Sequence, residues 1–182
     1  MTPVVLQGPR VLLRQWEDRD CPSFAALNAD PVAMQFFPST LTREESDAVV
    51  DRLRAVIAKN GWGFWCLEID GHCAGFTGLN VPTFAAPFMP AIEIGWRMLP
   101  RYWGCGYATE AARLALAYGF GALNADEIVA FTAPGNVRSR AVMERLGMRH
   151  DIDGDFDHPR VAVGHPLRRH VLYRIGLPSG LV

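Results

Sequence analysis

Lysine is nearly absent from this chain of 182 residues, because Lys59 is the only lysine among 18 basic residues. A mechanism that forms a Schiff base on a lysine would depend on that one side chain, and we do not expect such chemistry. The formal net charge is only −1 at pH 7. There is thus no overall positive field to attract phosphate backbones or anionic lipid, and we expect neither a nucleic-acid partner nor a membrane partner.

Cysteine is also scarce, with four residues and no C-x-x-C pair, so neither a disulfide scaffold nor a zinc or redox site is predicted. No stretch approaches the ~20 apolar residues that span a bilayer, and the first residues lack the basic and apolar regions of a secretion signal. We therefore expect a cytoplasmic protein. The length and the 49% content of hydrophobic residues predict a single globular domain over residues 1–182.

The order of the predicted elements indicates a mixed α/β fold. A capping box at Thr42 and Glu45 begins one helix, and the Asp70-Gly71 turn joins the two strands of a hairpin. Strands are expected at residues 10–16, 62–69, 72–81, 91–99, 127–132 and 171–175, an extended piece at 148–151, helices at 17–28, 42–60, 106–123 and 137–146, and a polar turn at 153–159. This order predicts a mixed sheet covered by helices on both faces.

The loop at residues 101–110 lies between a predicted strand and a predicted helix. Such a turn directs free backbone N–H groups and the positive end of the helix dipole at one point, which favours a bound anion. Gly104 and Gly106 lack Cβ atoms, so a phosphate group can approach the main chain. A P-loop is excluded by its missing lysine, and a Rossmann fingerprint fits poorly because Thr109 replaces its third glycine. The alternative is a glycine-rich turn that merely connects two elements.

Three motifs in order resemble one family. Arg101-x-x-Gly104-x-Gly106 resembles the R/Q-x-x-G-x-G/A pyrophosphate-binding loop of the GNAT acetyltransferases. The stretches at 91–96 and 103–111, and Asn136-Val137-Arg138-Ser139 followed by residues 144–148, resemble the RimJ/RimL-type branch. The resemblance covers Arg10 to about Ile175. It implies a GNAT fold, with a central, mostly antiparallel sheet splayed between its fourth and fifth strands, here residues 91–99 and 127–132.

The resemblance also implies acetyl-coenzyme A as the cofactor. Backbone amides between residues 101 and 108 would hold its diphosphate, the pantetheine arm would pair with backbone groups near Met98 and Leu99, and a backbone N–H of that strand would polarise the thioester carbonyl. The cofactor-binding residues implied are Met98, Leu99, Arg101, Gly104, Cys105, Gly106, Tyr107, Ala108, Asn136 and Ser139. Cys105 could instead act as a covalent nucleophile at the helix N-terminus, but no histidine stands beside it in the sequence, and we favour a small packed thiol.

Direct transfer to an amine needs a base for the ammonium proton and an acid for the leaving thiolate. Glu93 is the first candidate for the base, followed by His158 and by Asp155 and Asp157. Many family members carry a tyrosine where this chain has Met143, so Ser139 is the candidate for the acid. Ser139 could instead only cap the helix near Asn136. The predicted catalytic residues are Glu93, Ser139 and His158.

Loop aromatics resemble the walls of the family's acceptor site. They lie at Phe36-Phe37-Pro38, at residues 82–88 and at Phe156. Residues 82–90 could also form a dimer contact, and we expect a monomer or a homodimer. His158, His165 and His170 match no zinc spacing, and no metal is expected.

The sequence therefore predicts an N-acetyltransferase that moves acetyl from acetyl-coenzyme A to a primary amine of a small molecule or of a protein or peptide N-terminus. A non-catalytic acyl-coenzyme-A-binding module is the main alternative, because the family's tyrosine is missing. A nucleotide-dependent oxidoreductase is a third hypothesis. The sequence leaves the acceptor open.

Overall fold

The computed structural model describes residues 1–176. Its strands are β1 (Leu6–Gln7), β2 (Leu12–Arg14), β3 (Phe64–Ile69), β4 (His72–Asn80), β5 (Ile92–Met98), β6 (Glu127–Thr132), β7 (Arg149–Asp157) and β8 (Arg169–Gly176). Its helices are α1 (Cys21–Ala29), α2 (Arg43–Asn60), α3 (Tyr107–Gly121) and α4 (Val137–Arg145), with 3-10 turns at Asp18–Asp20 and Pro100–Tyr102. No helix within residues 1–176 is long and apolar enough to cross a membrane.

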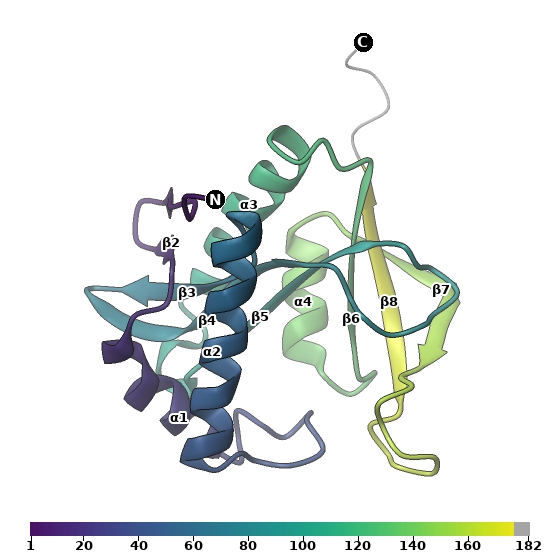
Figure 1. Ribbon diagram of the computed structural model, residues 1–182. Coiled ribbons are helices and arrows are strands. Elements are labelled where there is room, and N and C mark those ends of the chain that lie inside the picture. Colours follow the sequence, from purple (N-terminus) through teal and green to yellow (C-terminus); the bar gives the residue numbers. More distant parts are fainter. Residues whose placement is uncertain (177–182) are drawn as a thin grey trace.

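The strands form one sheet in the order β1-β2-β3-β4-β5-β6-β8-β7 (Figure 1). Every neighbouring pair is antiparallel except β5 and β6, which are parallel. These two strands pair only at Ile92 with Ile128 and at Glu93 with Val129, and then they separate. The predicted mixed, mostly antiparallel sheet with a splay between these two strands is therefore confirmed.

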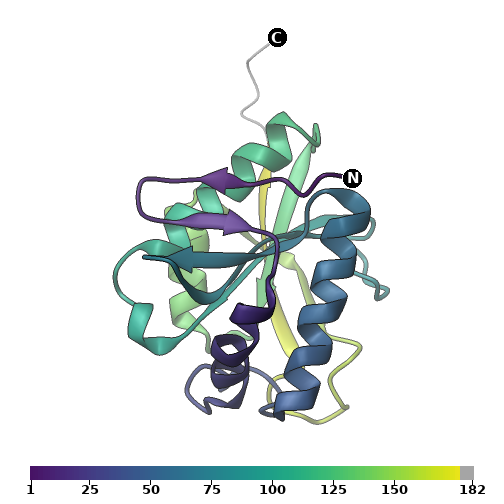
Figure 2. The ribbon, with the colours of Figure 1, turned by 60° about the vertical axis from the view of Figure 1, so that its left-hand side comes forward.

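Helices cover both faces of the sheet. The helices α1 and α2 pack together, with α1 on β4 and α2 on β3, whereas α3 packs on the other face of β4 and β5 (Figures 1 and 2). At Gly119, α3 lies so close to the sheet that a Cβ atom would stand 2.6 Å from Cδ1 of Ile128 and would displace that side chain. The short strands β1 and β2 form the opposite edge of the sheet from β7 (Figure 2).

Two local predictions were wrong. The strand β1 was not expected, and the predicted polar turn at 153–159 lies largely within β7, whose register shifts between Asp151 and Phe156. The aspartates of this stretch accept hydrogen bonds from the backbone: Asp155 from the N–H of Leu172 and Asp151 from the N–H of Gly154. Because these carboxylates have backbone donors, a polar stretch is accommodated in a strand, and the true connection to β8 begins at His158.

A buried ion pair joins β2 to the start of α1. The guanidinium of Arg14 donates to both carboxylate oxygens of Asp20, at 2.7 and 2.8 Å, and to Glu68 at 2.7 Å. Burial raises the pKa of Asp20, but the hydrogen bonds from Arg14 and from the backbone outweigh it, so that the pKa is lowered overall. The charged pair therefore contributes to folding stability at neutral pH.

We expect Asp20→Asn to lower the free energy of unfolding at pH 7 by about 3 kcal/mol, because it leaves the buried Arg14 charge undercompensated. The difference from wild type should shrink as the pH falls below about 4, since the lowered pKa of Asp20 makes its contribution present above that range and lost below it. Urea denaturation at several pH values measures both effects. The control is the exposed Asp18→Asn, which should cost less than about 1 kcal/mol; equal costs for the two variants would contradict the prediction.

Candidate active site

A cavity of about 1100 Å³ opens where β5 and β6 separate. It extends from the loop before α3, past the first turns of α4, to the segment between α1 and α2 and to the connection after β7. All the residues predicted to bind the cofactor line it except Leu99 and Arg101, and all three predicted catalytic residues line it. The residues that line the cavity thus come from segments far apart in the chain, the first at residue 33 and the last at residue 170.

The loop before α3 presents unpaired backbone donors to this cavity. Within the described residues, the N–H groups of residues 104–109 have no hydrogen-bond acceptor. Gly104 and Gly106 have φ angles of 77° and 82°, which favour glycine, and a Cβ atom at Gly104 would meet nothing within 4 Å. Together with the N-terminus of α3, this open cradle fits a diphosphate.

Two of the backbone N–H groups expected to bind the diphosphate, those of Tyr102 and Trp103, are already paired within the protein. The N–H of Tyr102 donates to Leu99 and that of Trp103 donates to Pro100, each at 3.0 Å, within a 3-10 turn. The continuous run of unpaired N–H groups therefore begins at Gly104. Arg101 is exposed, and its guanidinium lies 4.9 Å from the centre of the Tyr102 ring.

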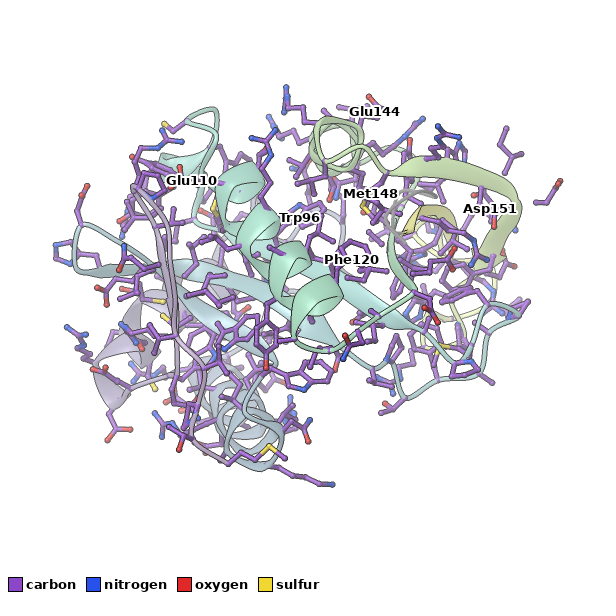
Figure 3. All side chains as sticks on the ribbon, turned by 90° about the horizontal axis from the view of Figure 1, so that it is seen from above. Trp96, Glu110, Phe120, Glu144, Met148 and Asp151 are labelled. Atoms are coloured by element: carbon purple, nitrogen blue, oxygen red, sulfur yellow. The ribbon has the colours of Figure 1, made fainter. Side chains whose placement is uncertain are left out.

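Side chains hold the loop in this shape. Arg10 donates to the carboxylate of Glu110 at 2.7 Å and to the carbonyl oxygen of Cys105 at 3.0 Å, and Trp103 Nε1 donates to the carbonyl oxygen of Met98 at 2.8 Å. Figure 3 shows Glu110 near the N-terminal end of α3. Cys105 is exposed rather than packed, which corrects the expectation, and its thiol donates a hydrogen bond to the carbonyl oxygen of Trp103.

Two cations of α4 were not singled out in the sequence. Arg138 and Arg145 both line the cavity, and the Arg138 guanidinium lies 4.7 Å from the centre of the Trp103 ring. Arg138 occupies the third position of the Asn136–Ser139 motif, so the motif itself held the signal. Their charge adds to the anion-attracting character of this end of the cavity.

The backbone of β5 offers donors to the gap. The N–H of Leu99 donates to Ala74 on β4 at 2.9 Å, so this group is not among the backbone groups near Met98 and Leu99 that are free to pair with a pantetheine arm. Because bonded pairs alternate along an antiparallel ladder, the backbone groups of Trp96 and Met98 point away from β4 and into the gap. The carbonyl oxygen of Met98 already accepts from Trp103, so its N–H is the group left to face the gap at this end of β5. Trp96 lies beside α3 (Figure 3).

Glu93 lies where the two strands begin to separate. Burial raises its pKa to about 7, although a hydrogen bond from Asn80 Nδ2 to Oε1, at 2.8 Å, and the positive charge of Arg160 act in the opposite direction. A carboxylate with a pKa near 7 can accept a proton at neutral pH and is strong enough as a base to be useful.

The other candidate bases are placed less well. His158 lines the cavity, but its Nδ1 accepts from the N–H of Arg160 at 3.2 Å, so Nε2 carries the proton and acts as a donor. Burial, aided by the charges of His170, Arg160 and Arg168, lowers its pKa to about 4. Asp155 and Asp157 do not line the cavity: Asp155 accepts from Leu172, and Asp157 pairs with Arg168 and Arg169.

Asn136, not Ser139, supplies the side chain that caps α4. Its Oδ1 accepts from the backbone N–H of Ser139 at 3.2 Å, while its Nδ2 donates to Thr132 at 2.9 Å. Ser139 lines the cavity, and its side chain is not the cap. Met143, at the position where a tyrosine is common, is almost fully buried but also reaches the cavity wall.

The loop aromatics divide into two groups. Phe36, Phe37 and Pro38 line the cavity, together with Phe131 of β6. Phe84, Phe88 and Phe156 pack behind Phe131, with ring centres 5.7, 5.9 and 5.5 Å from its ring. The loop at 82–88 therefore supports this wall and does not form it.

Comparison with solved structures agrees with this architecture. A GNAT-family acetyltransferase from Bacillus anthracis superposes with a TM-score of 0.78 and 26% identity, covering 95% of this chain and 98% of that one. RimJ of Mycobacterium smegmatis, solved in complex with CoA-disulfide, superposes with a TM-score of 0.71 and 25% identity, covering 97% and 90%.

Sequence comparison gives the family. The uncharacterized N-acetyltransferase YnaD of Bacillus subtilis is 30% identical over 148 residues, which cover 78% of this chain and 81% of that protein. The FsC-acetyl coenzyme A-N(2)-transacetylase of Aspergillus fumigatus is 34% identical over 131 residues, which cover 68% of this chain and 56% of that protein. Residues 10–149 match the acetyltransferase (GNAT) domain, so the chain belongs to the GNAT acetyltransferase family.

Proposed function

We propose that this protein transfers acetyl from acetyl-coenzyme A directly to a primary amine of a small molecule or of a peptide or protein N-terminus. The observation that carries the proposal is the row of unpaired N–H groups at residues 104–109, which faces a cavity running into the gap between β5 and β6. This arrangement suits a ligand with a diphosphate at one end and an extended amide-bearing arm. Glu93 stands farther along β5, where the acceptor would approach.

Each step is assigned to residues of this chain. The amides of residues 104–109 would hold the diphosphate, with Arg138 nearby, and the N–H of Met98 would donate to the thioester carbonyl oxygen, where negative charge develops during transfer. Glu93 would take one proton from the acceptor ammonium, directly or through water. The Ser139 hydroxyl would hydrogen-bond the departing sulfur, which takes up the second proton that the amine loses on becoming an amide. When bound, the coenzyme supplies an activated acyl group and a thiolate leaving group.

A binding module without catalysis is the second candidate, favoured by one observation: Met143 takes the place of the tyrosine common in the family. A screen of amines, amino acids and peptides for thiol release from acetyl-coenzyme A separates the two candidates. We expect rapid release with at least one acceptor. Tight cofactor binding with no release across the panel would support the module instead.

We expect Gly106→Val to weaken acetyl-coenzyme A binding at least tenfold, because a side chain there opposes the positive φ angle and blocks the approach to the loop amides. Calorimetric titration measures the dissociation constant. Gly71→Val is the matched control, since Gly71 has a φ of 78° and open surroundings but lies in the β3–β4 turn, away from the cavity. Equal, unchanged affinity in the two folded variants would refute the loop as the cofactor site.

We expect kcat/KM to rise about tenfold per pH unit below about 7 and to level off above it, because Glu93 must be deprotonated to act as the base. Glu93→Gln should lower the rate by roughly 10²-fold or more and remove this limb of the pH profile. Asn80→Leu should move the limb to higher pH, since it removes a hydrogen bond that lowers the pKa of Glu93. A limb that persists in Glu93→Gln would show that another group titrates.

A further inference from the structure

Arg97 lines the cavity, and its positive charge is surrounded mainly by aromatic side chains. It lies on β5, and its guanidinium carbon stands 5.6, 4.6 and 5.4 Å from the ring centres of Phe24, Phe37 and Phe76. Its Nη1 contacts the sulfur of Met34 at 2.8 Å, and a thioether is only a weak acceptor. The surrounding groups are thus aromatic rings and a thioether, with no oxygen acceptor among them.

Within residues 1–176, Arg97 has no carboxylate partner. Among the described residues, no aspartate or glutamate lies within 4.0 Å of its guanidinium, and its buried Nε has no acceptor. Burial lowers the pKa of Arg97 to about 10, so the side chain is still charged at neutral pH. Arg14, in contrast, pairs with Asp20 and Glu68 where it is buried. Arg97 is thus a partly buried cation whose buried Nε has no acceptor, and such a charge is costly to keep unless a ligand supplies an anion.

Arg97 lies on the side of the cavity away from the diphosphate loop, where the acceptor would bind. Residues 93, 95 and 97 share one face of β5, which is the face covered by α1 and by residues 34–37. Ile94 and Trp96 share the other face, where α3 follows the cofactor loop. Arg97 therefore points away from the side on which the diphosphate loop continues.

Between Glu93 and Arg97 the same face is apolar. The two Cα atoms are separated by four strand residues, roughly 13 Å. Gly95 lies between them, and the Phe64 ring covers it so closely that a Cβ atom would lie 3.1 Å from two ring carbons. Phe36, Phe37, Phe64 and Phe76 line the cavity as well. The site thus has an acid at one end, a cation at the other and aromatic groups between them.

We propose that Arg97 binds a carboxylate of the acceptor, so that the acceptor is an amino carboxylate with an apolar body, such as an amino acid or a short peptide. The planar guanidinium suits a carboxylate, which can accept two parallel hydrogen bonds. The aromatic rings around it hold the charge in place and exclude water. This inference rests on the proposed function, because it assigns the acceptor of the same site.

The test compares ligands that differ only in the carboxylate: phenylalanine with phenylalaninamide, glycyl-phenylalanine with its amide, and γ-aminobutyrate with its amide. Calorimetry on the enzyme saturated with coenzyme A measures binding without turnover. We expect at least one acid to bind at least tenfold more tightly than its amide. Equal affinities within every pair would overturn the proposal.

Arg97→Gln should abolish the preference for the acid and leave the affinity of the amide unchanged, while Arg97→Lys should keep part of the preference. A purely structural role for Arg97 would weaken acid and amide alike, and that result would overturn the proposal. If Arg97→Gln does not fold, the proposal is tested by the Arg97→Lys variant and by the comparison of each acid with its amide on the wild type. The dissociation constant of acetyl-coenzyme A should be unchanged in both variants. A failure of the proposed function would appear as no cofactor binding by the wild type, and this result is distinguishable from a failure of the acceptor assignment.

A carboxylate bound by Arg97 could instead belong to the acyl group of the donor, as in succinyl-coenzyme A. Succinyl-coenzyme A and acetyl-coenzyme A are therefore titrated into wild type and Arg97→Gln. We expect the two cofactors to bind wild type with similar affinity. A strong preference for succinyl-coenzyme A that disappears in Arg97→Gln would place the anion on the donor and would overturn the assignment to the acceptor.

Discussion

The parallel pairing of β5 and β6 is interrupted after two residue pairs, and the rest of the site depends on this interruption. Beyond Glu93 and Val129 the edge of β5 has no neighbouring strand, so its backbone donors face a cavity. An open edge inside a sheet would ordinarily be a liability. Here it provides a slot in which an extended amide-bearing ligand can take the place of the missing strand.

The shape of the loop that we propose to bind the cofactor could be predicted from the sequence, because its determinants are local. Two glycines with positive φ angles, the start of α3 and the cap at Asn136 all lie within short segments whose residue types specify their geometry. The motif does not show which backbone groups are already paired, such as the N–H of Leu99, which donates to Ala74 on the neighbouring strand.

The acceptor half could not be predicted in the same way, because its chemistry arises from segments far apart in the chain. Arg97 gains its character from Phe24, Met34 and Phe76, and the sequence gives no sign that these residues surround it or that no acid does. The role of His158 depends on its tautomer, which is set by the hydrogen bond that the backbone N–H of Arg160 donates to its Nδ1. The sequence alone does not show this bond. The prediction of a turn at 153–159 was wrong because the sequence shows that this stretch is rich in aspartate. It does not show that backbone N–H groups donate hydrogen bonds to those side chains.

The link from Arg10 to Glu110 and to the carbonyl oxygen of Cys105 fastens the edge of the sheet near β1 to the head of α3. Arg10 lies in the turn between β1 and β2, whereas its two partners belong to the segment that we propose to bind the diphosphate. A ligand that steadies this segment also steadies its anchor. Amide hydrogen exchange in the first strands would then slow on cofactor binding, although these strands touch no part of the cavity, and the N-terminal edge would report occupancy from a distance.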